Sequence, residues 1–288
     1  MRFVAPAFAG MLLAGGAVAA PAMWEISDSD SRVRVLGSIH ALPKDLDWRT
    51  ELLDTALAEA PFVYFETDIG PRGMLAMTVK MFALSFTMAQ DEPWTWRLTN
   101  EQTEILSDVL DKRGLTWTEV QYMPPWLLAA QLSMPGEEEE SLAGFDFVNG
   151  VENVLQWELM PERKGYFETP GQQFDMLAGG TIDEQIAFLF LEIEQMGGDD
   201  SVLADLVRAW ASGDQEAIAA MTVAGTPAEQ EALDRLLVDR NRNWVPMIER
   251  MLADNHDNLI VVGAAHLAGE NDVLDLMAEA GYTVTRIQ

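Results

Sequence analysis

Two stretches decide the fold, VRVLGSIH at residues 33–40 and LIVVGAAH at residues 259–266. Each is a run of aliphatic and β-branched residues followed by Gly and, three residues later, by His. Such runs favour buried strands. The chain has 3 His among its 288 residues, so two of the three share this context. We therefore expect the rest of the chain to bring His40 and His266 together.

The residues after His40 predict a strand–helix–strand unit. Residues 49–58 form an amphipathic pattern with Leu52, Leu53 and Leu57 on one side, and residues 62–65 (FVYF) read as a second strand that ends at Glu66. Strand, helix and strand within about 35 residues indicate parallel strands joined by a right-handed crossover. A third strand is expected at residues 165–167, ending at Glu168, and a fourth at residues 259–262.

The remaining segments are mostly helical. Thr99 to Gln102 form a capping box that opens a helix ending at Gly114, and Pro125 begins another. Further helices are expected at 74–88, 150–159, 183–196, 201–211, from Thr226 through Arg240, and after a cap at Asn271. Pro246 is expected to kink or break the long one. Residues 24–32 read as a polar lead-in, and residues 282–287 as a last strand.

Together these patterns predict an α/β fold with a central mixed, largely parallel sheet flanked by helices. A mostly helical insertion, at about residues 71–148, separates the second and third core strands. At 288 residues and 49% hydrophobic composition the chain can bury a full core. We expect a single domain over residues 23–288.

The charge balance limits the partners. The chain has 18 Lys and Arg against 47 Asp and Glu, a formal net charge of -29. Because Lys and Arg supply most nucleic-acid affinity, nucleic-acid binding is excluded. An anionic membrane surface would repel the chain. A peptide or small-molecule substrate remains as the expected partner, and the composition leaves the oligomeric state open.

Residues 1–22 have the pattern of a signal peptide. Arg2 precedes an uncharged run from Phe3 to Val18, and small-x-small cleavage sites follow, so a mature chain would begin near Ala20 or Met23. An uncleaved anchor is disfavoured because about 16 uncharged residues are short for a membrane-spanning helix. With 0 Cys and an export signal, we expect a bacterial periplasmic or envelope-associated protein without stable membrane insertion after cleavage.

Two His and two Glu are predicted to meet at one edge of the sheet. His40 and His266 follow their strands by a Gly turn, and Glu66 and Glu168 both lie in Tyr-Phe-Glu-Thr at strand ends. In α/β sheets, ligands bind beyond the carboxyl ends of the strands. Imidazole and carboxylate donors suit Zn, Mn or Co. Either His or either Glu can instead be a hydrogen-bonded structural residue.

Arg240 is the third notable feature, within the basic spot Asp239–Asn243 of an acidic chain. An Arg near this edge would pair with a Glu or stabilise an oxyanion. The alternative is a solvent-exposed helix turn with local ion pairs. His256 lies in a predicted turn and is expected on the surface.

With these residues in place, the chain resembles the TraB/PrgY/GumN family, which includes the Tiki metalloproteases, over nearly all of residues 23–288. The segments that carry the resemblance are Gly37–Pro43, Glu66, Pro125–Trp126, Gly150–Glu152, Phe167–Thr169 with Gln172–Gln173, Ala209–Trp210 with Gly213–Asp214, Arg240–Asn241 and Gly263–Glu270. The paired GxxH with a strand-end Glu is the specific part. The chain looks most like the exported GumN-like branch.

The resemblance implies membership of a wider clan with erythromycin esterase and a haem-binding lipoprotein. Tiki-like members are metal-dependent proteases that use both GxxH His and a Glu, with Mn or Co favoured. Carried onto this chain, the family pattern marks His40, Glu66 and His266, with Glu168 and Arg240 in support. Gly150-Val151-Glu152 departs from it, with Glu where the family has Asp. We therefore expect Glu152 to lie outside the site, and leave the role of Asn241 open.

The resulting hypothesis is an exported metal-dependent hydrolase, in its finer form a Tiki-like metalloprotease. The expected metal ligands are His40, Glu66 and His266. Glu168 would act as base or as a supporting carboxylate, and Arg240 would stabilise negative charge. Two alternatives stay open: a non-catalytic carrier of haem or metal that uses the same His, and a structural envelope role with a degenerate site.

Overall fold

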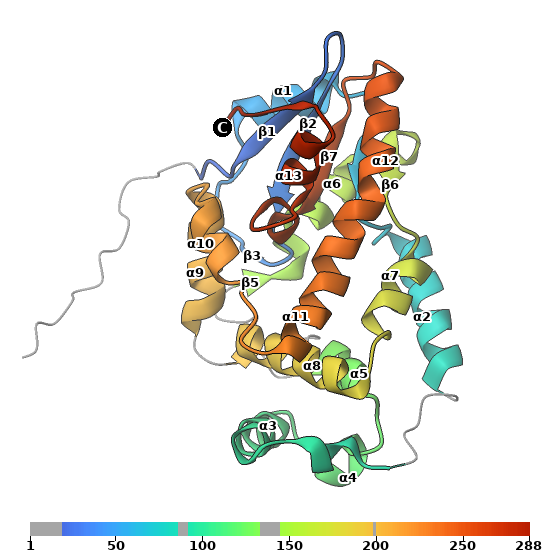
Figure 1. The fold of residues 1–288 in the computed structure, drawn as a ribbon, viewed down its shortest axis with the longest axis vertical. Helices are drawn as coiled ribbons and strands as arrows, with labels where there is room; N and C mark the ends of the chain where they lie inside the picture. Colours follow the sequence, from blue (N-terminus) through green and yellow to red (C-terminus); the bar gives the residue numbers. More distant parts are fainter. Residues whose placement is uncertain (1–18, 86–91, 133–144, 198–199) are drawn as a thin grey trace, which may run out of the picture.

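The computed structural model describes residues 19–85, 92–132, 145–197 and 200–288. Its centre is a 6-stranded sheet in the order β6-β4-β7-β2-β1-β8, with helices on both faces (Figure 1). The predicted α/β class, with a mixed, largely parallel sheet, is confirmed. The strands are β1 (Met23–Ser27), β2 (Arg32–Ser38), β4 (Val63–Phe65), β6 (Lys164–Tyr166), β7 (Leu259–Gly263) and β8 (Thr283–Arg286).

The two quoted stretches are neighbouring parallel strands. β2 pairs with β7 in a register that sets Gly37 opposite Val262 and Ser38 opposite Gly263. On its other side β7 pairs in parallel with β4, and β4 with β6. The four predicted core strands are therefore adjacent, and their carboxyl ends share one edge.

The predicted polar lead-in at residues 24–32 is wrong. Met23–Ser27 forms β1, antiparallel to both β2 and β8. Trp24 and Ile26 are buried on one face of β1, and on the other face Met23 is buried while Glu25 and Ser27 are half-buried. Glu25 and Ser27 obscured this strand, because a strand of an antiparallel pair can carry polar residues on one face.

Alternating residues of the strands face two separate hydrophobic clusters. One cluster contains Leu36, Val261 and Leu53 of the crossover helix α1 (Glu51–Glu59). The other contains Val35, Ile260 and the apolar side of α12 (Asp239–Ala253). Because successive side chains of a strand point to opposite faces, one continuous apolar run serves both clusters.

The segment between β4 and β6 is mostly helical, as predicted. Its helices are α2 (Pro71–Ser85), η1 (Trp94–Arg97), α3 (Asn100–Lys112), α4 (Trp117–Val120), α5 (Pro125–Leu132), η3 (Phe147–Asn149), α6 (Val151–Glu158) and η4 (Pro161–Arg163). A short antiparallel pair, β3 (Leu42–Pro43) with β5 (Phe145–Asp146), connects it to the turn that carries His40. The capping box at Thr99 is present. Residues 137–140, the run of four Glu, lie outside the described residues.

The second half of the chain supplies the covering helices. They are α7 (Pro170–Leu177), α8 (Ile182–Gly197), α9 (Asp200–Ala211), α10 (Gln215–Ala220), α11 (Pro227–Leu233), the π-helix η5 (Asp234–Val238), α12, η6 (Ala264–Leu267) and α13 (Val273–Glu279). α2 and α7 lie side by side at the outer margin (Figure 1). Pro246 lies inside α12, which continues on both sides of it.

Asp272, rather than the predicted Asn271, is the N-cap of α13. Its carboxylate accepts the N–H of Asp275 at 2.7 Å. Asn271 instead has a φ of 60° and precedes the cap. Both residue types are good N-caps, so the sequence alone does not choose between them.

Residues 19–22 pack against the folded domain. Ala19 N–H bonds to the carbonyl of Asp47 at 2.9 Å, and Ala20 N–H to that of Ala211 at 2.8 Å. Residues 1–18, which hold most of the predicted signal peptide, lie outside the described residues. Within the described part of the chain, no helix has the length and apolar character needed to span a membrane.

Candidate functional site

The side chains predicted to form the site all follow parallel strands. His40 comes two residues after β2, Glu66 directly after β4 and Glu168 two residues after β6, while His266 lies in η6 after β7. All four therefore emerge at the carboxyl edge of the sheet, where α/β proteins bind ligands. Glu66 and His266 are buried, whereas the His40 side chain is 65% exposed.

Arg240 connects three of these side chains. It lies on α12, is buried, and donates from Nη2 to Glu66 Oε2 at 2.5 Å and from Nε to Glu168 Oε1 at 2.8 Å. A third bond joins Nη2 to Glu168 Oε2 at 3.0 Å, so Glu168 receives a fork of two donors. The alternative of a solvent-exposed turn therefore does not hold for Arg240.

Glu66 is held as a carboxylate. Its Oε1 accepts the backbone N–H of Gly263 at 2.7 Å, and its Oε2 accepts from Arg240. Burial alone would raise the pKa of Glu66, but the charges of Arg240 and His40 hold it well below the ordinary value. Each oxygen keeps a further lone pair that can reach a ligand.

His266 is neutral, and each of its two ring nitrogens forms a hydrogen bond. Its Nε2 lies 2.9 Å from Arg240 Nη1, and its Nδ1 lies 2.6 Å from Asn241 Oδ1. Because a guanidinium only donates, Nε2 accepts and Nδ1 carries the proton. Burial, together with the charge of Arg240, lowers the pKa of His266 to about 3. Its Nε2 lone pair is therefore occupied by an N–H, and metal ligation by His266 requires Arg240 to move.

Glu152 lies inside the site, although the sequence led us to expect it outside. It is in the first turn of α6, is 5% exposed, and its Oε2 lies 3.2 Å from His40 Nδ1. Ser38 Oγ donates to the other oxygen. The carboxylate of Glu152 raises the pKa of His40 to about 9. The residue reaches the edge because α6 begins directly against the His40 turn.

The start of α6 fixes that contact. Val151 N–H bonds to the carbonyl of Ile39 at 3.0 Å. A Cβ on Gly150 would lie 2.0 Å from the His40 carbonyl oxygen, so only Gly permits this approach. The Gly-Val-Glu motif therefore joins two segments about a hundred residues apart and delivers its Glu to His40.

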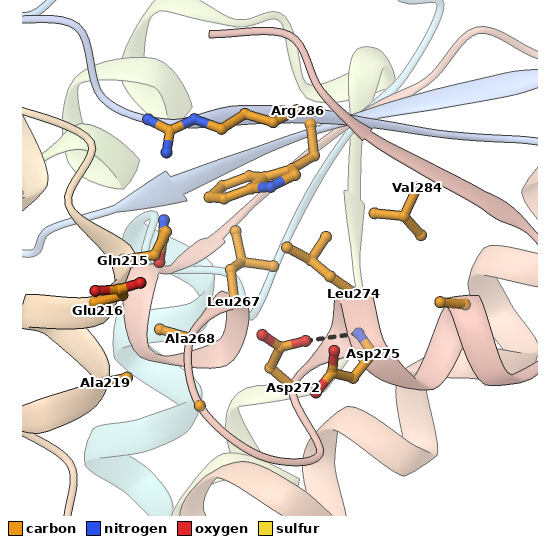
Figure 2. Close-up of a pocket in the computed structure, with 13 residues that line it drawn as sticks. Gln215, Glu216, Ala219, Leu267, Ala268, Asp272, Leu274, Asp275, Val284 and Arg286 are labelled. Carbon is orange, nitrogen blue, oxygen red and sulfur yellow. Dashed lines mark hydrogen bonds between the residues drawn. The ribbon is translucent and has the colours of Figure 1, made fainter.

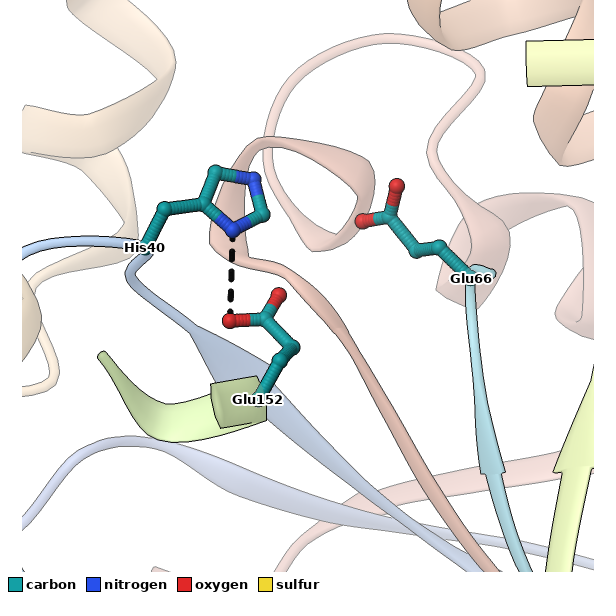
Figure 3. A group of neighbouring side chains, drawn as sticks. All are labelled: His40, Glu66 and Glu152. Atoms are coloured by element: carbon teal, nitrogen blue, oxygen red, sulfur yellow. Dashed lines mark ion pairs between the residues drawn. The ribbon is translucent and has the colours of Figure 1, made fainter. Parts of the chain in front are cut away.

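His40, Glu66 and Glu152 form a possible metal centre. One ligand atom from each lies within 4.8 Å of the other two. Figure 3 shows Glu152 paired with His40 while Glu66 faces the same space from the opposite side. Within the described residues, the partner of the buried Glu152 Oε2 is the His40 ring, at 3.2 Å from Nδ1. One imidazole and two carboxylates are a donor set that Zn, Mn or Co accepts, so the residues present fit a divalent ion.

Two contributors were not singled out in the sequence. Ser38 supports Glu152, and Trp244 contacts Glu168, His266 and Arg240 from α12. Asn241, whose role was open, orients His266 and is itself held through Nδ2 by the carbonyl of Asn271 at 3.1 Å. The available signal was the helical spacing of Trp244, four residues after Arg240 and on the same face of α12.

A separate cavity of about 400 Å³ lies beyond η6 (Figure 2). Its lining includes Trp24, Leu267, Asp272, Asp275 and Arg286, and none of the four strand-end side chains. The cavity therefore borders the residues that follow His266 in the sequence. It is not lined by His40, Glu66 or Glu152. The chemistry-bearing residues are those at the edge of the sheet.

The class defined by this fold and site is an α/β protein with a His-carboxylate-Arg centre at the edge of a parallel sheet. The family model of the TraB/PrgY/gumN family matches residues 22–286, and the chain belongs to that family. The resemblance inferred from the sequence is thereby confirmed. No curated protein and no solved structure gives a significant match.

Proposed function

We propose that this protein is an exported metal-dependent hydrolase whose ion is held by His40, Glu66 and Glu152. The observation that carries the proposal is the convergence of one ligand atom from each of these three side chains within 4.8 Å of one another. His266 was expected as the third ligand. The proposal gives that place to Glu152, because Arg240 already occupies His266 Nε2.

The surrounding residues have supporting roles. Glu168 receives two donors of Arg240 and keeps the guanidinium beside Glu66. Arg240 neutralises the buried carboxylates and is near enough to stabilise negative charge that develops on a substrate. His40, exposed and paired with Glu152, is the group that an incoming substrate meets first. When bound, a divalent ion polarises a carbonyl and lowers the pKa of water.

The finer form of the proposal is a Tiki-like metalloprotease that cleaves peptides, with Mn or Co preferred over Zn. It is supported by family membership and by the retention of both GxxH His and the strand-end Glu. Export to the periplasm is part of the proposal and is supported by the pattern of residues 1–22.

The test compares His40→Ala with His256→Ala. His256 is exposed in the turn before β7, so its replacement is a matched His control outside the site. We expect the purified protein to bind Mn²⁺ or Co²⁺ and to hydrolyse members of a peptide library. Hydrolysis should fall by at least about 100-fold in His40→Ala and stay unchanged in His256→Ala.

Two other results would redirect the proposal. Metal or haem retained without turnover, and lost on His40 or His266 replacement, would identify a carrier. A protein that binds no metal, and whose His40→Ala variant behaves as the wild type, would contradict a metal-dependent function.

A further inference from the structure

Trp244 contacts three residues of the site, Glu168, His266 and Arg240. It is 1% exposed on α12, one turn after Arg240. Its Nε1–H donates to Glu168 Oε1 at 3.0 Å. Its ring centroid lies 4.4 Å from that of His266 and 4.9 Å from Arg240 Cζ, a cation–π distance.

The indole is itself held in one orientation. Phe167 stacks on it with ring centroids 5.0 Å apart and planes 26° apart. Phe167 directly precedes Glu168, so the same chain segment supplies both the stacking partner and the hydrogen-bond acceptor. A fully buried ring fixed in this way presents its N–H in a defined direction.

The Trp244 N–H completes the bonding of the Glu168 carboxylate. Oε1 accepts from both Trp244 and Arg240 Nε, and Oε2 accepts from Arg240 Nη2. The last side-chain torsion of Glu has a broad energy minimum, so a carboxylate with fewer donors rotates readily. Rotation of Glu168 would turn the guanidinium that also bonds Glu66 and His266.

We propose that Trp244 is a positioning residue that, through Glu168 and Arg240, sets the direction in which Glu66 faces His40 and Glu152. The inference rests on the proposed metal-dependent function, since it concerns the orientation of a proposed ligand. Trp244 touches neither His40 nor Glu152 in the contacts described above, so its effect on the ion is indirect.

A purely structural role makes a different prediction. Trp244 belongs to the hydrophobic cluster on one face of the sheet, with Ile248 and Val262. If it served packing alone, its replacement would lower the free energy of unfolding and leave the metal affinity of the folded protein unchanged. The two readings are therefore separated by metal binding, and not by stability.

The test compares Trp244→Phe with Trp94→Phe. Both Trp are at most 2% exposed and both donate an indole N–H, which in Trp94 goes to the carbonyl of Met123 at 2.6 Å in the helical insertion. Each variant keeps an aromatic ring and loses its indole N–H, which in Trp94 also reaches the carbonyl of Val120 at 3.2 Å. The measurements are the Mn²⁺ dissociation constant, kcat and KM for a cleaved peptide, and urea unfolding.

We expect both variants to lose stability. Trp244→Phe alone should also weaken Mn²⁺ binding and lower kcat, each by about 10-fold, with KM within about 2-fold of the wild type. Combining it with Glu168→Gln should add little to the effect of either change, because both act on one chain of contacts.

The contradicting results are distinct. If the wild type binds Mn²⁺ and turns over peptide, and Trp244→Phe matches Trp94→Phe in both, the positioning role is wrong and the proposed function stands. If the wild type binds no metal, both fall. Should Trp244→Phe not fold, Glu168→Gln replaces it, and unchanged Mn²⁺ affinity in that variant overturns the inference.

Discussion

Glu152 shows how a single side chain can be misjudged from its place in the sequence. Its motif departs from the family's Asp, and the extra methylene suggested a position outside the site. In the structure, the longer side chain spans from the first turn of α6 to His40 Nδ1, at 3.2 Å. The departure is therefore compatible with a ligand role.

We predict that Glu152→Gln weakens Mn²⁺ binding by about 10–100-fold, because a neutral amide replaces a buried anionic donor. Metal titration of the folded variant measures this. Glu158→Gln is the control on the same helix, since Glu158 is exposed and pairs with Arg49. Equal affinity of Glu152→Gln and the wild type would show that Glu152 does not hold the ion.

Asp272, which lies outside the site, is expected to make the stability of the fold depend on pH. Burial raises the pKa of this N-cap residue to about 6. A raised pKa means that the folded state prefers the protonated acid, so stability is lost as the pH rises from about 4 through 6. Asn is neutral throughout and still caps the helix.

Asp272→Asn should therefore gain stability over the wild type between about pH 4 and 6, and keep a constant gain of roughly 1–3 kcal/mol above pH 7. Urea unfolding at several pH values tests this. Curves for the two proteins that run parallel from pH 4 to 8 would contradict the raised pKa.

The junction of η3 and α6 governs the site through backbone packing. Gly150 lies so close to the His40 carbonyl that Gly150→Ala must displace one of the two segments. We predict a loss of roughly 1–3 kcal/mol in unfolding free energy together with weaker Mn²⁺ binding. Gly171→Ala is the control, because its Cβ would meet no atom closer than 3.6 Å. If Gly150→Ala loses this much stability but binds Mn²⁺ as tightly as the wild type, the packing of α6 against the His40 turn does not govern the metal site.

The core elements were predictable because each carries its own signal. The strand run at residues 259–262 is continuous and apolar, and the run at 33–36 is interrupted only by Arg34, a pattern typical of strands buried on both faces. β1 was missed because Trp24 to Ser27 mixes apolar and polar residues and becomes a strand only through its pairing with β2 and β8. Pro246 was expected to kink or break a helix, and α12 contains it without ending there.

The site was predictable to the extent that strand ends converge. His40, Glu66, Glu168 and His266 follow from the rule that parallel strands share a carboxyl edge. Glu152 and Trp244 come from helices, and their approach depends on packing that no local pattern encodes. Arg240 was recognisable as a basic residue in an acidic chain and as part of the family pattern. Its burial between two carboxylates is a tertiary result.

The net charge of -29 acts on the molecule as a whole. Like charges on a compact surface repel each other, and salt screens that repulsion. We predict that raising NaCl from about 0.02 M to about 0.3 M increases the Tm by a few degrees. Thermal unfolding at fixed pH measures it. A lower Tm at high salt would mean that surface ion pairs such as Arg34–Glu59 outweigh the repulsion.

The most direct test of the central claim is a crystal structure grown with Mn²⁺, with anomalous scattering recorded. The account predicts one strong peak in the space between His40, Glu66 and Glu152, within about 2.0–2.3 Å of a nitrogen or oxygen of each. Arg240 should still bridge Glu66 and Glu168. The absence of a peak at a saturating Mn²⁺ concentration, or a peak held by other residues, would contradict the proposed metal centre.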